Sequence, residues 1–346
     1  MTEDRPQPAL TIGICGLGLI GSSVARGLMP HHRILGLDSD PETLAKAAEL
    51  GVESVAELAT FSGCDIIFLC APTSVNQQTL ASLMAWPTPV PVVDIGSVKS
   101  PIHDLWLTDP DFPFIGSHPM AGSELSGIES GQPTLFEFAT WPVVVHERTN
   151  AAALLMVVQL IDELRARAVP VTAKRHDEAV ALASHLPHLL AAVLGETVAS
   201  SGITQLALTL AAGSFRDATR VTASPPDRTA EFLLLNREPL AAVARNAAAK
   251  LEALAIDLER GDLAGVTGAF ERAQRARYVL DERSSERMAS EWTATAIEGN
   301  ATGLRDIMLS EADTGTEIAT IQATDDGHFQ GYLARHSILG YVESTP

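Results

Sequence analysis

The chain of 346 residues carries 24 Lys and Arg against 43 Asp and Glu, a formal net charge of -19. This charge argues against nucleic acids and anionic membrane surfaces as partners, because both would be repelled. A small anionic substrate needs only a local cluster of arginines. With 46% hydrophobic and 19% charged residues the chain has a globular composition, and its length predicts two domains.

The cysteines and the N-terminal residues indicate a cytoplasmic protein. Cys15, Cys64 and Cys70 are odd in number, and Cys15 and Cys70 lie within or at the end of apolar runs, which is typical of buried, reduced thiols. Residues 1–8 are polar and acidic and lack the pattern of a secretory signal. The sequence contains no run of about 18 consecutive apolar residues, the length that a membrane helix requires.

A glycine motif opens the first domain. Residues 10–28 read LTIGICGLGLIGSSVARGL, an apolar run followed by small and apolar residues at helical spacing. Gly16 permits a tight turn, Gly18 lets the backbone approach a pyrophosphate, and Gly21 lets the helix pack closely. Leu19 and Ile20 complete the motif, at a helix N-terminus that would receive the phosphates. We predict a dinucleotide site formed by these five residues.

Asp38 ends the second apolar run, RILGLD, twenty positions after Gly18. At this spacing its carboxylate can accept hydrogen bonds from the adenosine ribose hydroxyls. Asp38 and Asp40 would repel a phosphate at the 2′ position, so the sequence favours NAD over NADP. The alternative is that Asp38 caps a helix beginning at PETLAKAAEL.

Further strand-like runs alternate with helical stretches at 75–85 and 100–107. The strands are expected within 64–72, 89–100, 112–116 and 141–146. This alternation predicts an α/β Rossmann-like domain over residues 1–174, built on one parallel sheet. Ligands of such sheets bind beyond the carboxyl ends of the strands. These ends carry Ala71, Pro72, Gly96 and Ser97, which we expect to contact the cofactor.

His118 lies in IGSHPMAGSE, after the next strand end. Together with Ser97 it can therefore face the nicotinamide end of the cofactor. An imidazole there can accept a hydroxyl proton while hydride leaves the carbinol carbon, because its ordinary pKa is close to neutral pH. The alternative is a loop histidine that binds backbone carbonyls.

The second half is predicted to be an all-α substrate and dimerisation domain over residues 175–311. Residues 175–201 indicate one long apolar helix, kinked at Pro187. His185 and His188 are three apart and share a face. A metal site with His176 lacks a carboxylate or thiolate partner at ligand spacing, so we predict no metal.

The segment AAGSFRDATR supplies two arginines one helical turn apart, Arg216 and Arg220, with Asp217 between them. A guanidinium fork is a common receptor for carboxylates. The alternative is a surface ion pair of small energetic value.

Residues 239–288 indicate packed helices whose exposed apolar face would form a dimer seam. The tail, 312–346, alternates around Asp-Asp-Gly and predicts a β-hairpin.

These motifs, in this order, resemble the TyrA family of prephenate and arogenate dehydrogenases of tyrosine biosynthesis. The resemblance rests on GLGLIGSSVARGL, DIGSVKS, GSHPMAGSELSG, HDEAVALASHLPHLL and GSFRDATR, and covers roughly residues 10 to 310. It implies a Rossmann-like domain holding NAD, a helical homodimerisation domain, and substrate between them. The implied reaction is oxidative decarboxylation of prephenate to 4-hydroxyphenylpyruvate. The alternative is an arogenate dehydrogenase that forms tyrosine directly.

The resemblance also assigns roles to residues. His118 would be the catalytic base that accepts the hydrogen of the ring hydroxyl, and Ser97 would orient that hydroxyl and His118. His188 matches the second histidine of the substrate pocket, and Arg220 matches the arginine that binds a prephenate carboxylate. His185, Arg216 and Asp217 are expected in the same pocket, with Asp217 a candidate receptor for the arogenate ammonium.

The ends of the chain and the lysines of its second half bear on regulation and on rival functions. The tail is too short for a full regulatory ACT domain, and no chorismate mutase domain precedes the first strand, so we expect a monofunctional enzyme. The 6-phosphogluconate and 3-hydroxyacid dehydrogenases use a lysine of the second domain, whereas Lys174 and Lys250 lie in no matching motif here. An NAD-binding redox sensor would explain the glycines and Asp38 but leave His118, Ser97 and Arg220 without a common task.

Overall fold

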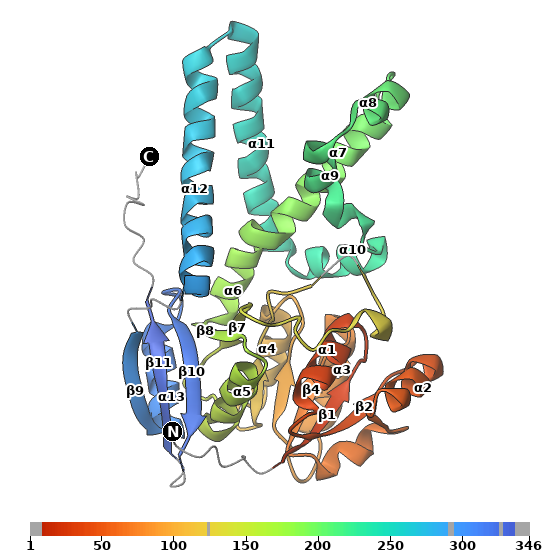
Figure 1. Cartoon of the computed structure of the whole chain (residues 1–346), viewed down its shortest axis with the longest axis vertical. Coiled ribbons are helices and arrows are strands. Elements are labelled where there is room, and N and C mark those ends of the chain that lie inside the picture. Colours follow the sequence, from red (N-terminus) through yellow and green to blue (C-terminus); the bar gives the residue numbers. More distant parts are fainter. Residues whose placement is uncertain (1–8, 123–124, 290–293, 325–327, 336–346) are drawn as a thin grey trace.

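The computed structural model describes residues 9–122, 125–289, 294–324 and 328–335. Two β-sheets lie side by side, and long helices extend away from them (Figure 1). The predicted fold class, a parallel Rossmann-like sheet followed by helices, is confirmed. The N-terminal octapeptide, the Asp-Asp-Gly turn at 325–327 and the predicted end of the hairpin at 336–342 lie outside the described residues.

The first sheet has six parallel strands in the order β3-β2-β1-β4-β5-β6. Its strands β1 and β4 are almost continuously apolar and buried, because helices cover both faces of a parallel sheet. The strands are β1 (Thr11–Cys15), β2 (Arg33–Leu37), β3 (Glu53–Ser54), β4 (Ile66–Leu69), β5 (Val92–Asp94) and β6 (Phe114–Gly116). The helices between them are α1 (Leu19–Leu28), α2 (Pro41–Glu49), α3 (Thr73–Met84) and α4 (Ser100–Trp106).

The second sheet corrects the expectation of a single sheet. The run at 141–146 forms β7 (Thr140–Val144), which pairs in parallel with β8 (Arg167–Val171) rather than joining β6 as a seventh strand. Helix α5 (Ala151–Glu163) connects them. The two sheets meet where the chain after β6 runs antiparallel to β7, with a bridge between Ser117 and Val143.

The C-terminal segment completes this second sheet, whose order is β7-β8-β10-β11-β9. The predicted hairpin is confirmed as β10 (Glu317–Ala323) and β11 (His328–Ala334), which are antiparallel. Residues 294–311, placed in the helical domain by the sequence, instead form β9 (Ala294–Asn300) and α13 (Ala301–Glu311). Strand β9 pairs with β11, and α13 buries Leu304 and Met308 in the core that includes α5. Residues 294–311 therefore belong to the second sheet and its covering helices, and not to the helical domain before them.

The predicted long helix over 175–201 is present and continuous from Ala173 to Ala199. It consists of α6 (Ala173–Val180), a π-helical turn (Ala181–His185) and α7 (Leu186–Ala199). Pro187 is the second residue of α7, directly after the π-helical turn, and its missing N–H explains the local change in hydrogen bonding. The α-helices between α7 and β9 are α8 (Thr204–Leu210), α9 (Gly213–Thr219), α10 (Pro226–Leu235), α11 (Arg237–Arg260) and α12 (Leu263–Ala289).

The helix Ala173–Ala199 is also long and apolar enough, by length and composition alone, to cross a membrane. This differs from the expectation based on consecutive apolar residues. Only 22% of its most apolar window is buried within the chain. An exposed apolar surface of this kind is typical of a site that another protein or a lipid surface covers.

Candidate active site

A cavity of about 1080 Å³ lies between the strand ends of the first sheet and the helices that follow. Most of the residues predicted for the site line it. They are Gly16, Gly18, Leu19, Ile20, Asp38, Ala71, Pro72, Gly96, Ser97, His118, His185, His188 and Arg220. The cavity therefore joins the predicted dinucleotide loop to the predicted catalytic histidine and to the helical domain.

The glycine loop has the geometry that its three glycines require. Gly16 has φ +91°, a left-handed conformation that disfavours other residues. At Gly18 no atom lies within 4 Å of the position that a Cβ would take, so a ligand can approach its backbone. A Cβ on Gly21 would lie 1.9 Å from the Gly16 carbonyl oxygen. Gly21 thus supports the loop from behind and, unlike the prediction, is not among the lining residues.

Asp38 lines the cavity at the end of β2 and fixes the glycine loop. Its carboxylate accepts hydrogen bonds from the Leu17 N–H at 2.7 Å and the Asp40 N–H at 3.0 Å. The alternative in which Asp38 caps α2 is wrong, because Asp40 is the N-cap and accepts from the N–H groups of Glu42 and Thr43.

The backbone around His118 is held by β7. The His118 N–H donates to the Pro142 carbonyl at 3.0 Å, and the Met120 N–H donates to the Thr140 carbonyl at 2.8 Å. Just before it, the Ser117 hydroxyl accepts from the buried Trp141 indole N–H at 3.0 Å. The second sheet, unexpected from the sequence, therefore positions the predicted catalytic residue.

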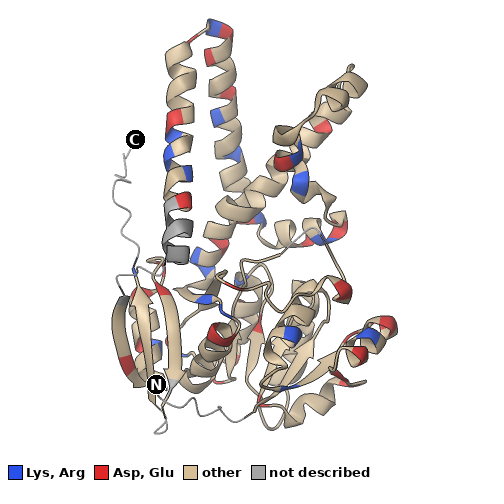
Figure 2. Ribbon diagram, viewed as in Figure 1, with Lys and Arg blue, Asp and Glu red and all other residues tan. Residues whose placement is uncertain are grey.

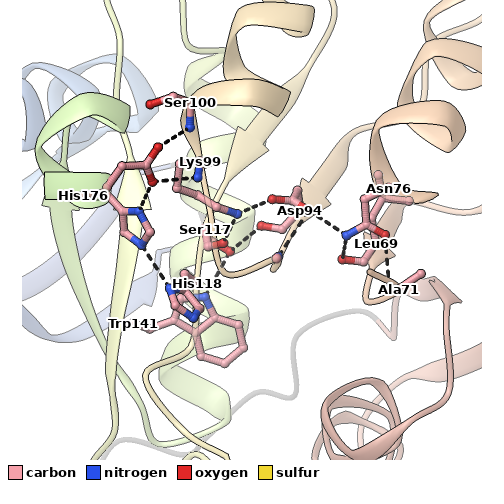
Figure 3. Close-up of polar contacts among 12 residues, drawn as sticks. Leu69, Ala71, Asn76, Asp94, Lys99, Ser100, Ser117, His118, Trp141 and His176 are labelled. Carbon is pink, nitrogen blue, oxygen red and sulfur yellow. Dashed lines mark hydrogen bonds and ion pairs between the residues drawn. The ribbon is translucent and has the colours of Figure 1, made fainter. Parts of the chain in front are cut away.

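The His118 ring belongs to a hydrogen-bonded series that we call the histidine relay, made of His118, His176 and Asp177. Figure 3 labels its two histidines. Nδ1 of His118 lies 3.0 Å from Nε2 of His176, and Nδ1 of His176 lies 2.8 Å from the Asp177 carboxylate. A carboxylate only accepts, so His176 donates from Nδ1 and accepts at Nε2. His118 then donates from Nδ1. Its Nε2 keeps a lone pair and is available as a base.

The protonation of the relay agrees with this assignment. Burial lowers the pKa of His118 well below its ordinary value, and His176, Lys99 and His185 lower it further. Burial also lowers the pKa of His176, against the opposing effect of its hydrogen bond to Asp177. Both rings are therefore neutral at pH 7. Ser97 lines the same cavity, but the ring partner of His118 is His176, not Ser97 as expected.

The helical side of the cavity carries the other two predicted histidines. His185 is buried, and burial lowers its pKa to about 4, with a smaller effect from His188. Its Nδ1 accepts from the Asn236 amide at 3.0 Å. His188 donates from Nδ1 to the Ser184 carbonyl at 2.9 Å. Phe232 packs against both rings, with centroid separations of 5.0 and 5.3 Å.

The arginines are only partly where the sequence placed them. Arg220 lines the cavity, and so does Arg228, which the sequence analysis missed. Arg216 and Asp217, on α9, are not lining residues. Glu231 of α10 also lines the cavity and accepts a 2.6 Å hydrogen bond from the Ser74 hydroxyl on α3, linking the helical part to the first sheet's helices.

Sequence reasoning also missed the role of His176 and Asp177. The sequence singles out His176 only as a candidate metal ligand and indicates no role for Asp177. Their adjacency was the available signal, since an acidic neighbour can fix a histidine tautomer. Among the described residues, no group of three or more His, Cys, Asp or Glu side chains is placed to hold a metal.

Comparison with known proteins identifies the family of this chain. Residues 24–170 match the family model for the nucleotide-binding domain of prephenate dehydrogenase, and residues 172–271 match the model for its dimerization domain. Prephenate dehydrogenase of Lactococcus lactis is 32% identical over 78% of this chain and 77% of its own length. That of Bacillus subtilis is 31% identical over 66% of this chain, and the alignment spans 65% of that relative.

Solved structures agree. Prephenate dehydrogenase from Aquifex aeolicus, in complex with hydroxyphenyl propionate and NAD+, has a TM-score of 0.73 and 25% identity. The match covers 80% of this chain and 100% of that one. Synechocystis arogenate dehydrogenase has a TM-score of 0.66 and 29% identity over 78% of this chain and 100% of its own. The chain belongs to the prephenate dehydrogenase family.

Proposed function

We propose that the protein is an NAD-dependent prephenate dehydrogenase that converts prephenate to 4-hydroxyphenylpyruvate. The observation that carries the proposal is the histidine relay, which presents a neutral base, His118 Nε2, in the same cavity as the dinucleotide loop and two arginines. A redox sensor would need no such base beside its nucleotide. Family membership and the resemblance to an NAD+-bound prephenate dehydrogenase structure support the same function.

The loop residues fit a dinucleotide. Gly18 leaves its backbone open to a pyrophosphate, the N-terminus of α1 favours negative charge, and Asp38 offers carboxylate oxygens to ribose hydroxyls. NAD bound there supplies the hydride acceptor. Asp38 and Asp40 would disfavour a 2′-phosphate, which supports NAD over NADP.

The chain's own residues perform the remaining steps. His118 Nε2 accepts the proton of the ring hydroxyl as the carbinol carbon loses hydride, and the carbinol becomes a ketone. The bond from the ring to its carboxylate then breaks, carbon dioxide leaves, and the electron pair enters the ring to give an aromatic phenolate. The phenolate oxygen takes back the proton held on His118 Nε2, which gives the phenol and restores the base. Arg220 and Arg228 would hold carboxylates of the dianionic substrate, and Ser97 would orient the hydroxyl. Aromatisation and loss of carbon dioxide make the reaction effectively irreversible.

The choice of prephenate over arogenate rests on the charge of the helical side. Arogenate replaces the keto group of prephenate by an ammonium-bearing carbon. Asp217, the expected ammonium receptor, is not a lining residue, and Glu231 is already hydrogen-bonded to Ser74. Two arginines line this side, which favours the more negative substrate.

Purified protein with NAD is expected to form NADH with prephenate, at a kcat/KM at least about tenfold above that with arogenate, a difference of about 1.4 kcal/mol in transition-state binding. The measurement is NADH absorbance with each substrate at equal concentration. If the protein turned over arogenate but not prephenate, arogenate would be its substrate and the proposed mechanism would still hold. Tight NADH binding without turnover of either would instead support the sensor.

We also propose that the helical domain forms a homodimer. The helices of the predicted seam, α11 and α12, expose large apolar side chains such as Leu258 and Phe270, and α7 and α8 expose more, among them Val193 (56%), Leu206 (56%) and Leu210 (73%). Between residues 179 and 215 Glu196 is the only Asp, Glu, Lys or Arg, and Figure 2 shows α7 and α8 almost without charge. The match of residues 172–271 to a dimerization domain supports a second copy, rather than lipid, as the cover.

Sedimentation equilibrium is expected to give twice the mass of one chain. The double substitution Leu206→Glu and Leu210→Glu should produce monomers, because charges would be buried in the seam. Exchange of exposed Leu107, on the first domain, for Glu is the matched control and should leave the dimer intact. A wild-type protein that remains monomeric at micromolar concentrations would contradict the proposal.

Localisation and other partners follow from composition. The described cysteines are free thiols, and burial raises the pKa of Cys15 to about 12 and that of Cys64 to about 11, which keeps them protonated. Free thiols fit a reducing compartment, and we place the protein in the cytoplasm. The net charge of -19 argues against nucleic acid and anionic membranes as partners. Cell fractionation would test the location.

A further inference from the structure

Three polar side chains without solvent exposure lie behind the strand ends of the cavity. Asn76, Asp94 and Lys99 are each 0% exposed, and none of them lines the cavity. We call them the buried polar cluster. Asp94 and Lys99 form an ion pair, and Asn76 donates to the Asp94 carboxylate at 2.7 Å. Because these side chains do not reach the cavity, they can influence the proposed reaction only through other residues.

The cluster holds the loops after β4 and β5. The Asn76 amide nitrogen donates to the Leu69 carbonyl at 3.1 Å, and its oxygen accepts from the Ala71 N–H at 3.1 Å. The Asp94 carboxylate accepts from the Gly96 N–H at 3.2 Å. Ala71 and Gly96 both line the cavity, so the cluster fixes two of its walls.

The cluster also holds the loop after β6, which carries the base. The Lys99 ammonium donates to the Ser117 carbonyl at 2.6 Å, directly before His118. The Lys99 backbone N–H donates to Asp177 at 2.8 Å, and Asp177 binds His176, which binds His118. Lys99, Asp177, His176, His118 and Ser117 therefore form a closed ring of contacts. Figure 3 labels Lys99, Ser117, His118 and His176 of this ring. Displacing Lys99 would disturb His118 from both its backbone side and its ring side.

Stability is a poor explanation for such a cluster. Removing an ion pair from water carries a large desolvation cost, and well-packed apolar residues of similar volume are often as stabilising or more so. A buried, fully hydrogen-bonded network does, however, fix the relative positions of the segments it joins. The segments joined here are the three strand-end loops at which the nicotinamide and the base must meet.

We propose that Asn76, Asp94 and Lys99 are positioning residues that set the loops after β4, β5 and β6 at the mutual positions needed for hydride and proton to leave the substrate together. The inference rests on the proposed dehydrogenase function. It assigns no contact with substrate or cofactor to the three residues. Lys99 is the member that ties His118 to the other two loops.

The test uses the full-length double variant Asp94→Asn/Lys99→Met. It removes both buried charges, so no charge is left unpaired, and the amide oxygen introduced at position 94 can still accept from Asn76 and Gly96. The tie to Ser117 is lost. We expect kcat to fall about 10²-fold, because misplacement of a reacting group by roughly 1 Å costs that much. NADH affinity, measured by fluorescence titration, and substrate KM should stay close to the wild-type values.

Amide hydrogen exchange provides a second readout that needs no turnover. In the double variant, exchange should rise in peptides covering 114–120 and remain unchanged in 33–37, which form β2. In Asn76→Ala it should rise in 69–72 instead. Lys46→Met is the matched control, since Lys46 is an ion-paired lysine of the same domain outside the cavity, and it should leave kcat and exchange at 114–120 unchanged.

The outcomes separate this inference from the proposed function. A folded double variant with wild-type kcat would overturn the inference, as would unchanged exchange at 114–120. A loss of kcat matched by an equal loss of NADH affinity would also overturn it, because general weakening of the domain would then explain the result. Absence of turnover by the wild-type protein on prephenate and arogenate would refute the proposed function, while the exchange experiment would still decide whether the cluster holds the loops.

Discussion

Replacement of His118 by asparagine is expected to lower kcat for prephenate by about 10³-fold, within the range that positioned general bases contribute. Asparagine retains a side chain of similar reach but cannot take a proton at neutral pH. The backbone contact of His118 with Pro142 does not depend on the ring. Cofactor affinity should therefore be unchanged, because Gly16, Gly18 and Asp38 are untouched.

Single-turnover and steady-state NADH formation, together with NADH titration, would measure this effect. The exposed His31, replaced by asparagine in the same way, is the control and should keep wild-type kcat. If His118→Asn retained more than about a tenth of wild-type kcat, the residue would lack the role of general base that the mechanism requires.

The relay also predicts the pH dependence of the reaction. Burial, followed by His176, Lys99 and His185, lowers the pKa of His118 well below the ordinary histidine value near 6.5. The base remains unprotonated as pH falls through that value. We expect kcat/KM to stay flat from neutral pH to below about 6.5 and to decline only at lower pH. An acidic limb of kcat/KM centred at or above the ordinary histidine value would contradict the lowered pKa of His118 in the free enzyme.

Replacement of Asp177 by asparagine is expected to lower kcat by about 10²-fold without contact between Asp177 and the substrate. Asp177 accepts from His176 and from the N–H groups of Lys99 and Ser100. An amide cannot accept at both of its ends, so at least one donor loses its partner. The negative charge that stabilises a proton arriving on the relay is also lost, which makes His118 a weaker base.

A pH profile separates this effect from simple loss of structure. Hydrogen bonds from His176 and Ser100 lower the pKa of Asp177 although burial opposes them, so the residue is ionised in the wild-type enzyme. Without this charge the acidic limb of kcat/KM should move to lower pH. Asp111→Asn, at an exposed ion pair with Arg148, is the control and should change neither value. An unshifted limb in a folded Asp177→Asn protein would remove Asp177 from the relay.

Local pattern was sufficient for much of the fold. The glycine motif, the strand before it and the helix after it are all contiguous in the chain, so their geometry depends on neighbouring residues. The long helix at Ala173–Ala199 and the hairpin of β10 and β11 were likewise predictable from period and turn residues. The domain boundary failed at 294–311, because β9 and α13 are defined by partners elsewhere in the chain rather than by their own pattern.

For the site, the residue types and their order indicate the available chemistry: a glycine loop with Asp38 for a dinucleotide, a histidine after a strand end, and an arginine for a carboxylate. How these groups are connected depends on the packing of elements that lie far apart in the chain. His118 and His176 are 58 positions apart, and Lys99 and Asp177 are 78 apart. Such contacts depend on how β6, α4 and α6 pack together, and hydrogen bonds at about 3 Å tolerate little displacement. Residue order can indicate which side chains could react, whereas packing determines which of them meet.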